Sequence, residues 1–86
     1  MPEISRFFGI IMRMRYNDHA PPHFHVYSGE SMAAIGLRPL RILEGELRPR
    51  VLGLVIERAA LHHDELLVDW DLARKRLPLR KIAPLV

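Results

Sequence analysis

The hydrophobic period of this chain changes once, between Gly45 and Pro49. Before this point apolar and polar residues alternate over short segments, as in residues 12–16, which is typical of strands with one buried face. After it, apolar residues recur every three or four positions over residues 52–73, which is typical of an amphipathic helix. This single change of period predicts an α+β fold, in which a sheet is followed by helical structure packed on one face.

Short apolar segments in the first half of the chain predict a small antiparallel sheet of three to four strands. Two of these segments are separated by residues 28–31, Ser-Gly-Glu-Ser, which are turn formers and predict a hairpin. The expected strands cover residues 8–16, 23–27 and 32–37, with a short fourth strand over residues 40–44.

The helical stripe of the second half is long for a chain of this size. One unbroken helix over residues 48–76 would measure about 43 Å, whereas a domain of this length has a radius of gyration of about 12 Å. We therefore expect two shorter helices, with a break at residues 62–64 and Asp64 as the cap of the second helix. The alternative is one long helix whose overhang a second subunit covers. Pro78 ends helical structure in either case, and we expect the tail over residues 79–86 to pack back on the sheet.

The composition limits the class of protein. We expect a single domain over residues 1–86, and the absence of cysteine excludes a disulfide framework and a thiolate metal site. No apolar run approaches the roughly 20 residues of a membrane span, and the first residues lack the features of a signal peptide. These observations predict a cytoplasmic protein without a membrane partner. The net charge of +3 permits nucleic-acid or acidic protein partners without requiring either.

Three of the five histidines lie within seven residues, around a pair of prolines. His23 and His25 are two positions apart in an expected strand, so their side chains should point to the same face, with Cα atoms about 6.6 Å apart. His19 is held nearby by the loop. Imidazoles are good ligands for divalent transition metals, so His19, His23 and His25 are candidate metal ligands, with Asp18 or His62 as a fourth.

A structural role is the alternative for the same histidines. They would then bond backbone carbonyls around the proline loop or form a contact surface for a partner. His63 lies on the apolar helical stripe, and we expect it to be a core or helix-end histidine. No serine lies in a nucleophile-elbow pattern, and the chain has no glycine-rich phosphate loop. Catalytic residues are therefore not assigned, and no residues are expected to bind an organic cofactor.

Basic residues gather at two places in the sequence. Arg13 and Arg15 share one side of an expected strand, and Arg74, Lys75 and Arg76 are consecutive near the C-terminus. All five are candidate contacts to a partner or to nucleic acid. We favour an acidic protein partner, because no helix-turn-helix, zinc finger or aromatic stacking platform is present. The helical half is also acidic, through Glu57, Asp64, Glu65, Asp69 and Asp71.

Six motifs are spread over nearly the whole chain. They are Ile4-Ser5-Arg6-Phe7-Phe8-Gly9-Ile10, Asn17-Asp18-His19-x-Pro21-Pro22-His23-Phe24-His25, Leu43-Glu44-Gly45, Ala60-Leu61-His62, Asp64-Glu65-Leu66-Leu67 and Pro78-Leu79-x-Lys81-Ile82-x-Pro84-Leu85. Together they resemble the small bacterial proteins of domain-of-unknown-function family 4160. Val68 and Asp69 depart from the pattern, because relatives more often carry a Glu-Asn-like pair there, and we expect a neutral surface change.

The resemblance implies little about activity, since the family has none established. It does imply a stand-alone domain, often encoded beside a small protein of domain-of-unknown-function family 2442, in a toxin–antitoxin-like pair. We therefore expect a small cytoplasmic interaction or regulatory module that acts with such a protein or with a second copy of itself. The loop around residues 19–25 would be its site surface. The alternative is a metal-dependent hydrolase or nuclease that uses His19, His23 and His25 as ligands.

Overall fold

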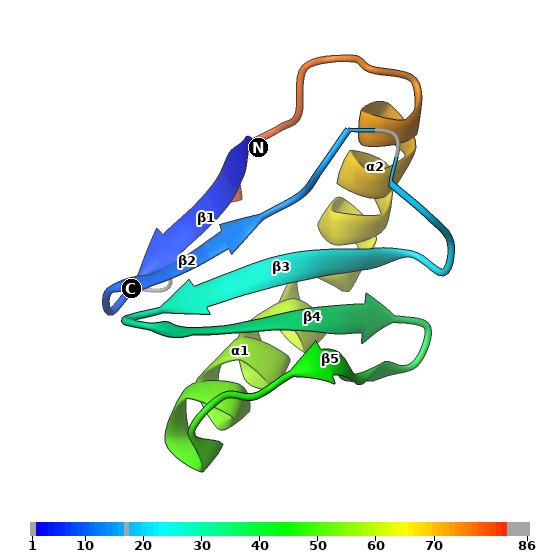
Figure 1. Cartoon of the computed structure of the whole chain (residues 1–86). Coiled ribbons are helices and arrows are strands. Elements are labelled where there is room, and N and C mark those ends of the chain that lie inside the picture. Colours follow the sequence, from blue (N-terminus) through cyan, green and yellow to red (C-terminus); the bar gives the residue numbers. More distant parts are fainter. Residues whose placement is uncertain (1, 17, 83–86) are drawn as a thin grey trace.

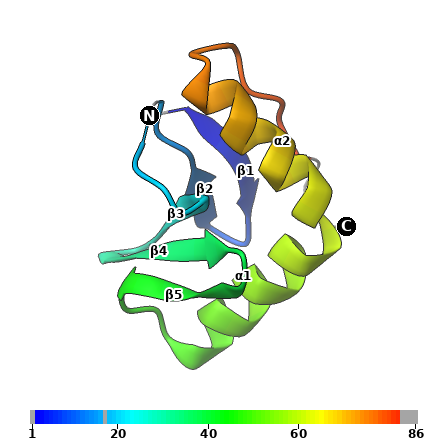
Figure 2. The same cartoon turned by 90° about the vertical axis from the view of Figure 1, so that its right-hand side faces the viewer.

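The computed structural model of the chain describes residues 2–16 and 18–82. Five strands form one antiparallel sheet in the order β1-β2-β3-β4-β5, and two helices cover one face of it (Figures 1 and 2). The prediction of an α+β fold with helices packed on one face is confirmed. The elements are β1 (Glu3–Phe7), β2 (Ile10–Arg13), β3 (His23–Ser28), β4 (Ser31–Leu37), β5 (Leu40–Gly45), α1 (Pro49–Leu61) and α2 (His63–Arg74).

The sheet has one strand more than expected, because β1 was not predicted, and the segment predicted as a strand over residues 8–16 begins with a turn. Phe8 and Gly9 both have positive φ angles, 49° and 74°, and they join β1 to β2 as a two-residue hairpin turn. β1 itself escaped prediction because Ile4 and Ser5 are both buried. The register shifts between Glu3 and Ser5, so the alternation that marks a strand is broken there.

The core lies between the sheet and the two helices. Met12, Val26 and Ala33 are neighbours across three adjacent strands, and all of them are buried. In the middle of the sheet this row of side chains therefore lies in the core with the helices. The helices contribute Val55 and Ala59 from α1, and Leu66, Trp70 and Ala73 from α2.

The helical half is interrupted at His62, so the expected break is confirmed and the chain carries two shorter helices. The expected cap was wrong: His62, and not Asp64, is the residue before the first turn of α2. His63 explains the difference, since its Nε2–H donates to the Leu37 carbonyl oxygen at 2.6 Å and ties the start of the helix to β4. The described chain has a radius of gyration of 11.6 Å. None of its helices is long and apolar enough to cross a membrane.

The tail returns to the outer strand β1, as expected, over the part that the structure describes. The Ile82 N–H donates to the Ile4 carbonyl oxygen at 2.8 Å, and the Ile82 side chain is buried. Residues 83–86 of the predicted tail lie outside the described residues. Asp69 was expected at the surface, and this was wrong. Its side chain is fully buried and accepts the Arg80 N–H at 2.8 Å, so it holds the start of the tail.

Candidate functional site

The chain between β2 and β3 is fixed at both of its ends by backbone hydrogen bonds. At the first end the Met14 N–H donates to the Pro2 carbonyl oxygen at 3.1 Å. At the second end the Leu37 N–H donates to the Pro22 carbonyl oxygen at 2.9 Å, which extends the pairing of β3 with β4. Prolines cannot donate to a ladder, but their carbonyl groups still accept. The segment that leads into His23 is therefore positioned by the sheet.

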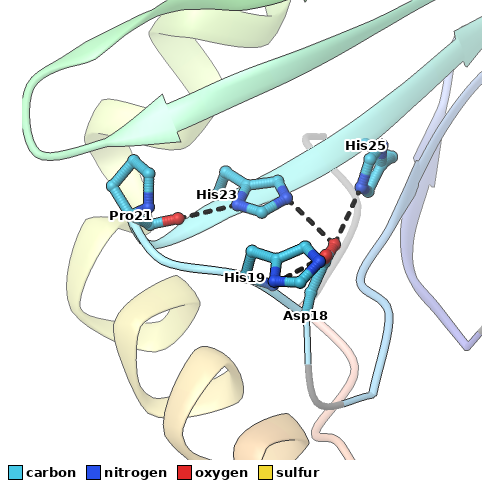
Figure 3. Close-up of polar contacts among 5 residues, drawn as sticks. All are labelled: Asp18, His19, Pro21, His23 and His25. Carbon is cyan, nitrogen blue, oxygen red and sulfur yellow. Dashed lines mark hydrogen bonds and ion pairs between the residues drawn. The ribbon is translucent and has the colours of Figure 1, made fainter.

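Asp18, His23 and His25 converge at the start of β3 (Figure 3). Asp18 Oδ2 lies 2.9 Å from His23 Nε2 and 3.2 Å from His25 Nε2. The two imidazole rings are 5.1 Å apart between centroids, as expected for residues i and i+2 of a strand. The side chains of Asp18, His23 and His25 are 13%, 11% and 9% exposed. The cluster is thus largely, but not completely, shielded from solvent.

The orientation of His23 is set by a backbone carbonyl. Its Nδ1 lies 2.7 Å from the Pro21 oxygen, which can only accept, so Nδ1 carries a proton and donates (Figure 3). This directs Nε2 toward Asp18 Oδ2, 2.9 Å away. A metal ion bound at Nε2 would leave the bond to Pro21 in place, which is the usual support of a histidine ligand.

The electrostatic surroundings favour the protonation states that metal ligands need. Burial acts to raise the pKa of Asp18, but the hydrogen bonds from the His19 N–H and His25 and the charge of His23 outweigh it, so this pKa is lowered. Burial lowers the pKa of His25, and the charges of Arg15 and His23 add to it, against the hydrogen bond to Asp18. Asp18 is thus held as a carboxylate and His25 as a neutral imidazole, the forms that bind metal ions.

The two distances from Asp18 also fit a metal ion. Two ligand atoms that are each about 2.1 Å from one ion lie about 3.0 Å apart at a right angle and about 3.4 Å apart at a tetrahedral angle. The two distances from Asp18 Oδ2, 2.9 and 3.2 Å, are of this size. All three ligand atoms lie within 4.8 Å of one another. For all three to bind one ion, the two imidazole Nε2 atoms must come within about 4.2 Å of each other.

The other histidines considered as ligands lie outside this cluster. His19 is exposed, and its backbone N–H donates to Asp18 Oδ1 at 2.8 Å. His62 Nδ1 pairs with Glu65 Oε1 at 2.7 Å on the helices. His63 bonds the Leu37 carbonyl, which agrees with the expected helix-end role. The structure therefore brings Asp18, the candidate fourth ligand, to His23 and His25, and it uses the backbone of His19 to orient Asp18.

An open hollow of about 260 Å³ lies over the cluster. Ala34 and Glu44 line it, and they belong to the same cross-strand row as His25. A second hollow shares Arg15, His25, Ala34 and Glu44 with the first and extends past Met32 and Gly45. Together the two hollows form a groove that begins at the cluster and crosses β4 toward β5.

Two of the predicted basic contacts lie beside this groove. Arg13 is the direct cross-strand neighbour of His25, and its guanidinium lies 5.6 Å from the centroid of the Tyr27 ring. Arg15 lines both hollows. Arg74, Lys75 and Arg76 are exposed at the end of α2, and Arg76 shares a shallow hollow with Tyr16, three residues before His19. Contact of these residues with a partner stays a prediction.

Comparison with known proteins gave one match. A family model described as a domain of unknown function, DUF4160, matches residues 9–71, which is 63 of the 86 residues and includes Asp18, His23 and His25. Neither the search of curated proteins nor the search of solved structures found a match.

Proposed function

This chain belongs to the DUF4160 family, and we propose that it binds a divalent transition metal ion through Asp18, His23 and His25. The membership confirms the resemblance drawn from the sequence, and it assigns no activity. The observation that supports the proposal is the convergence of one carboxylate oxygen and two imidazole Nε2 atoms within 4.8 Å. The bond from His23 Nδ1 to the Pro21 oxygen adds to it, because it aims Nε2 before any metal arrives.

The reaction that suits such a site is hydrolysis, in a metal-dependent hydrolase or nuclease. Asp18, His23 and His25 would hold the metal ion as two histidines and one carboxylate. The ion would supply Lewis-acid polarisation of a carbonyl or phosphoryl oxygen of a substrate. Arg15 lines the groove and Arg13 is the cross-strand neighbour of His25, and both favour an anionic substrate such as a phosphate ester. No residue is assigned as the general acid or base.

Metal binding is tested with untagged protein, because a histidine tag would bind metal itself. Elemental analysis and calorimetric titration with zinc, nickel and iron should give about one equivalent per chain for the wild type. A His23→Ala/His25→Ala double variant should bind none, and Asp18→Asn should bind at least about tenfold more weakly, because it removes a charged ligand. His62→Ala is the matched control, a histidine of similar kind outside the cluster, and should bind as the wild type does.

His19→Ala tests whether the metal ligands are Asp18, His23 and His25, as the structure indicates, or His19, His23 and His25, as the sequence predicts. Because the structure uses the backbone N–H of His19 and not its ring, this variant should also retain metal. Wild-type protein that takes up none of the three metals, or a His62→Ala variant that loses metal as completely as the double variant, would contradict the proposal.

A second candidate function is a cytoplasmic interaction or regulatory module in a toxin–antitoxin-like pair. It is favoured by the contacts of Asp18 Oδ2 with His23 and His25, which fix the loop before β3. The exposed His19 and Pro21 would then form a rigid contact surface. Co-purification with a DUF2442 protein encoded nearby would test it. A complex that forms equally well in chelator, and that raises the melting temperature of this chain, would support this function over the metal-dependent one.

A further inference from the structure

Phe8 stands out on the surface of the molecule, at the turn between β1 and β2. Its side chain is 74% exposed, and its ring lies edge-on to Phe7 at 6.2 Å between centroids. Its φ angle of 49° lies in the left-handed region, which is unfavourable for a bulky side chain. A two-residue turn of this kind favours Asn, Asp or Gly at this position. An aromatic residue here carries backbone strain and buries little apolar surface within the fold.

Phe8 lies beside a hollow that is lined by apolar side chains and has basic residues at its edge. Phe8, Ile10, Val51 and Leu54 line a hollow between the hairpin and the first turns of α1, with Arg50 at its side. A neighbouring hollow shares Ser28 and Val51 with it and continues past Glu30 to Arg48. Arg48 and Arg50 are both exposed. We call these two joined hollows the Phe8 surface.

We propose that the Phe8 surface binds an acidic segment of a partner protein. An apolar side chain of that segment would lie against Phe8, Val51 and Leu54, and its carboxylates would pair with Arg48 and Arg50. The first turn of α1 adds to this preference, because it contains no acidic residue and no side chain caps it, so its free N–H groups favour anions. Contact with the partner would then explain why an exposed aromatic side chain occupies a position with a strained backbone.

The Phe8 surface is separate from the metal-ligand cluster. It includes Ser28, the last residue of β3, whereas His23 is the first, so the two sites are about 16 Å apart along the strand. Figure 1 shows the β1–β2 and β3–β4 turns at one end of the sheet and the loop before β3 at the other. Partner binding at Phe8 therefore needs neither metal nor an intact histidine cluster.

Phe8→Asn is the decisive variant, because it distinguishes a role of Phe8 in stabilising the fold from a role in binding a partner. Asn suits the left-handed turn, so the variant should melt at the same temperature as the wild type or higher. It removes the aromatic ring, so partner binding should fall. The matched control is Leu61→Asn, which removes an exposed apolar residue elsewhere on α1. Arg48→Gln/Arg50→Gln tests the basic rim.

The probes are three synthetic helical peptides of equal length with leucines at the same positions and Glu, Gln or Lys between them. Calorimetry and amide chemical shifts should show binding of the Glu peptide to the wild type and to Leu61→Asn. Affinity should fall at least about tenfold for Phe8→Asn and for the double arginine variant, as expected for central contacts. The Gln peptide should bind more weakly than the Glu peptide, and the Lys peptide should not bind.

Several results would overturn this proposal. One is no binding of the Glu peptide up to about 1 mM, the weak end of specific affinities, and another is equal binding of all three peptides. A lower melting temperature for Phe8→Asn would assign Phe8 to the fold. A wild-type dimer that Phe8→Asn converts to a monomer would make the surface a self-interface. Stronger Phe8-dependent binding to anionic phosphatidylglycerol vesicles than to the Glu peptide would make it a membrane contact.

Discussion

Two aspartates on α2, Asp69 and Asp71, lie in opposite surroundings. Asp71 is exposed, whereas Asp69 is fully buried. Asp69 Oδ1 accepts the Arg80 N–H, but Oδ2 has no hydrogen-bond partner among residues 2–16 and 18–82. Burial raises the pKa of Asp69, and the charge of Glu65 adds to this, while the bond and charge of Arg80 act in the opposite direction. A buried carboxylate oxygen without a partner destabilises the folded state.

Asp69→Asn should therefore raise the free energy of unfolding at pH 7, by about 1 kcal/mol. The amide oxygen keeps the bond from Arg80, and the buried charge is removed. A carboxyl group whose pKa is raised by folding lowers stability above that folded pKa, and has no such effect below its unfolded pKa of about 3.9. The gain should thus be full at pH 7 and should vanish near pH 3.5, as measured by urea unfolding. Asp71→Asn is the control and should give no gain; loss of stability in Asp69→Asn at pH 7 would contradict this account.

Among the elements, α1 and α2 meet at His62 and His63. The side chains of these two histidines have different hydrogen-bond partners. His63 bonds the Leu37 carbonyl at the end of β4, in a partly buried position. His62 pairs with Glu65 in an exposed position. The first contact links a helix to the sheet, and the second links residues within one helical turn.

His63→Ala should lower the free energy of unfolding by about 1–2 kcal/mol, because it leaves a partly buried carbonyl without its donor. His62→Ala should change it by less than about 0.5 kcal/mol, since exposed ion pairs contribute little. Urea denaturation of both variants at pH 7 compares them directly. Equal effects of the two substitutions would mean that the junction is held by helix packing and not by the bond to Leu37.

At the scale of the whole molecule, the tail closes one side of the sheet. β1 is an edge strand, and the Ile82 N–H pairs with its Ile4 carbonyl. Ile82 adds a side chain to the core, at 3% exposure, beside Ile4 at 0%. Because the tail is far from β1 in sequence, this contact joins the two ends of the chain. It also covers part of an edge that would otherwise be open to pairing with other strands.

Ile82→Ala should lower the free energy of unfolding by about 2–4 kcal/mol, as for other large-to-small core substitutions. Lys81→Ala, at the exposed neighbouring position, should have little effect. Hydrogen exchange should show faster exchange of the β1 amides in Ile82→Ala than in the wild type. If exchange in β1 were the same in both proteins, the tail would contribute no protection to this edge.

Local periodicity was sufficient to predict most of the strands, the two helices and the facing pair of histidines. Alternation gave β2 to β5 to within a few residues, and the helical stripe together with chain length gave two helices with a break at residue 62. The i, i+2 spacing of His23 and His25 placed both imidazoles on one face. These follow because strand and helix geometry fix the direction of side chains over short distances.

Which of the candidate ligands lie together depends on tertiary contacts that the sequence pattern does not contain. The loop before β3 brings Asp18 Oδ2 to His23 and His25 and leaves His19 exposed. It is also the tertiary structure that buries Asp69 under the tail and exposes Phe8 at a turn inside a predicted strand. These outcomes depend on contacts between residues far apart in sequence or on the path of an irregular loop, and hydrophobic periodicity carries no information about either.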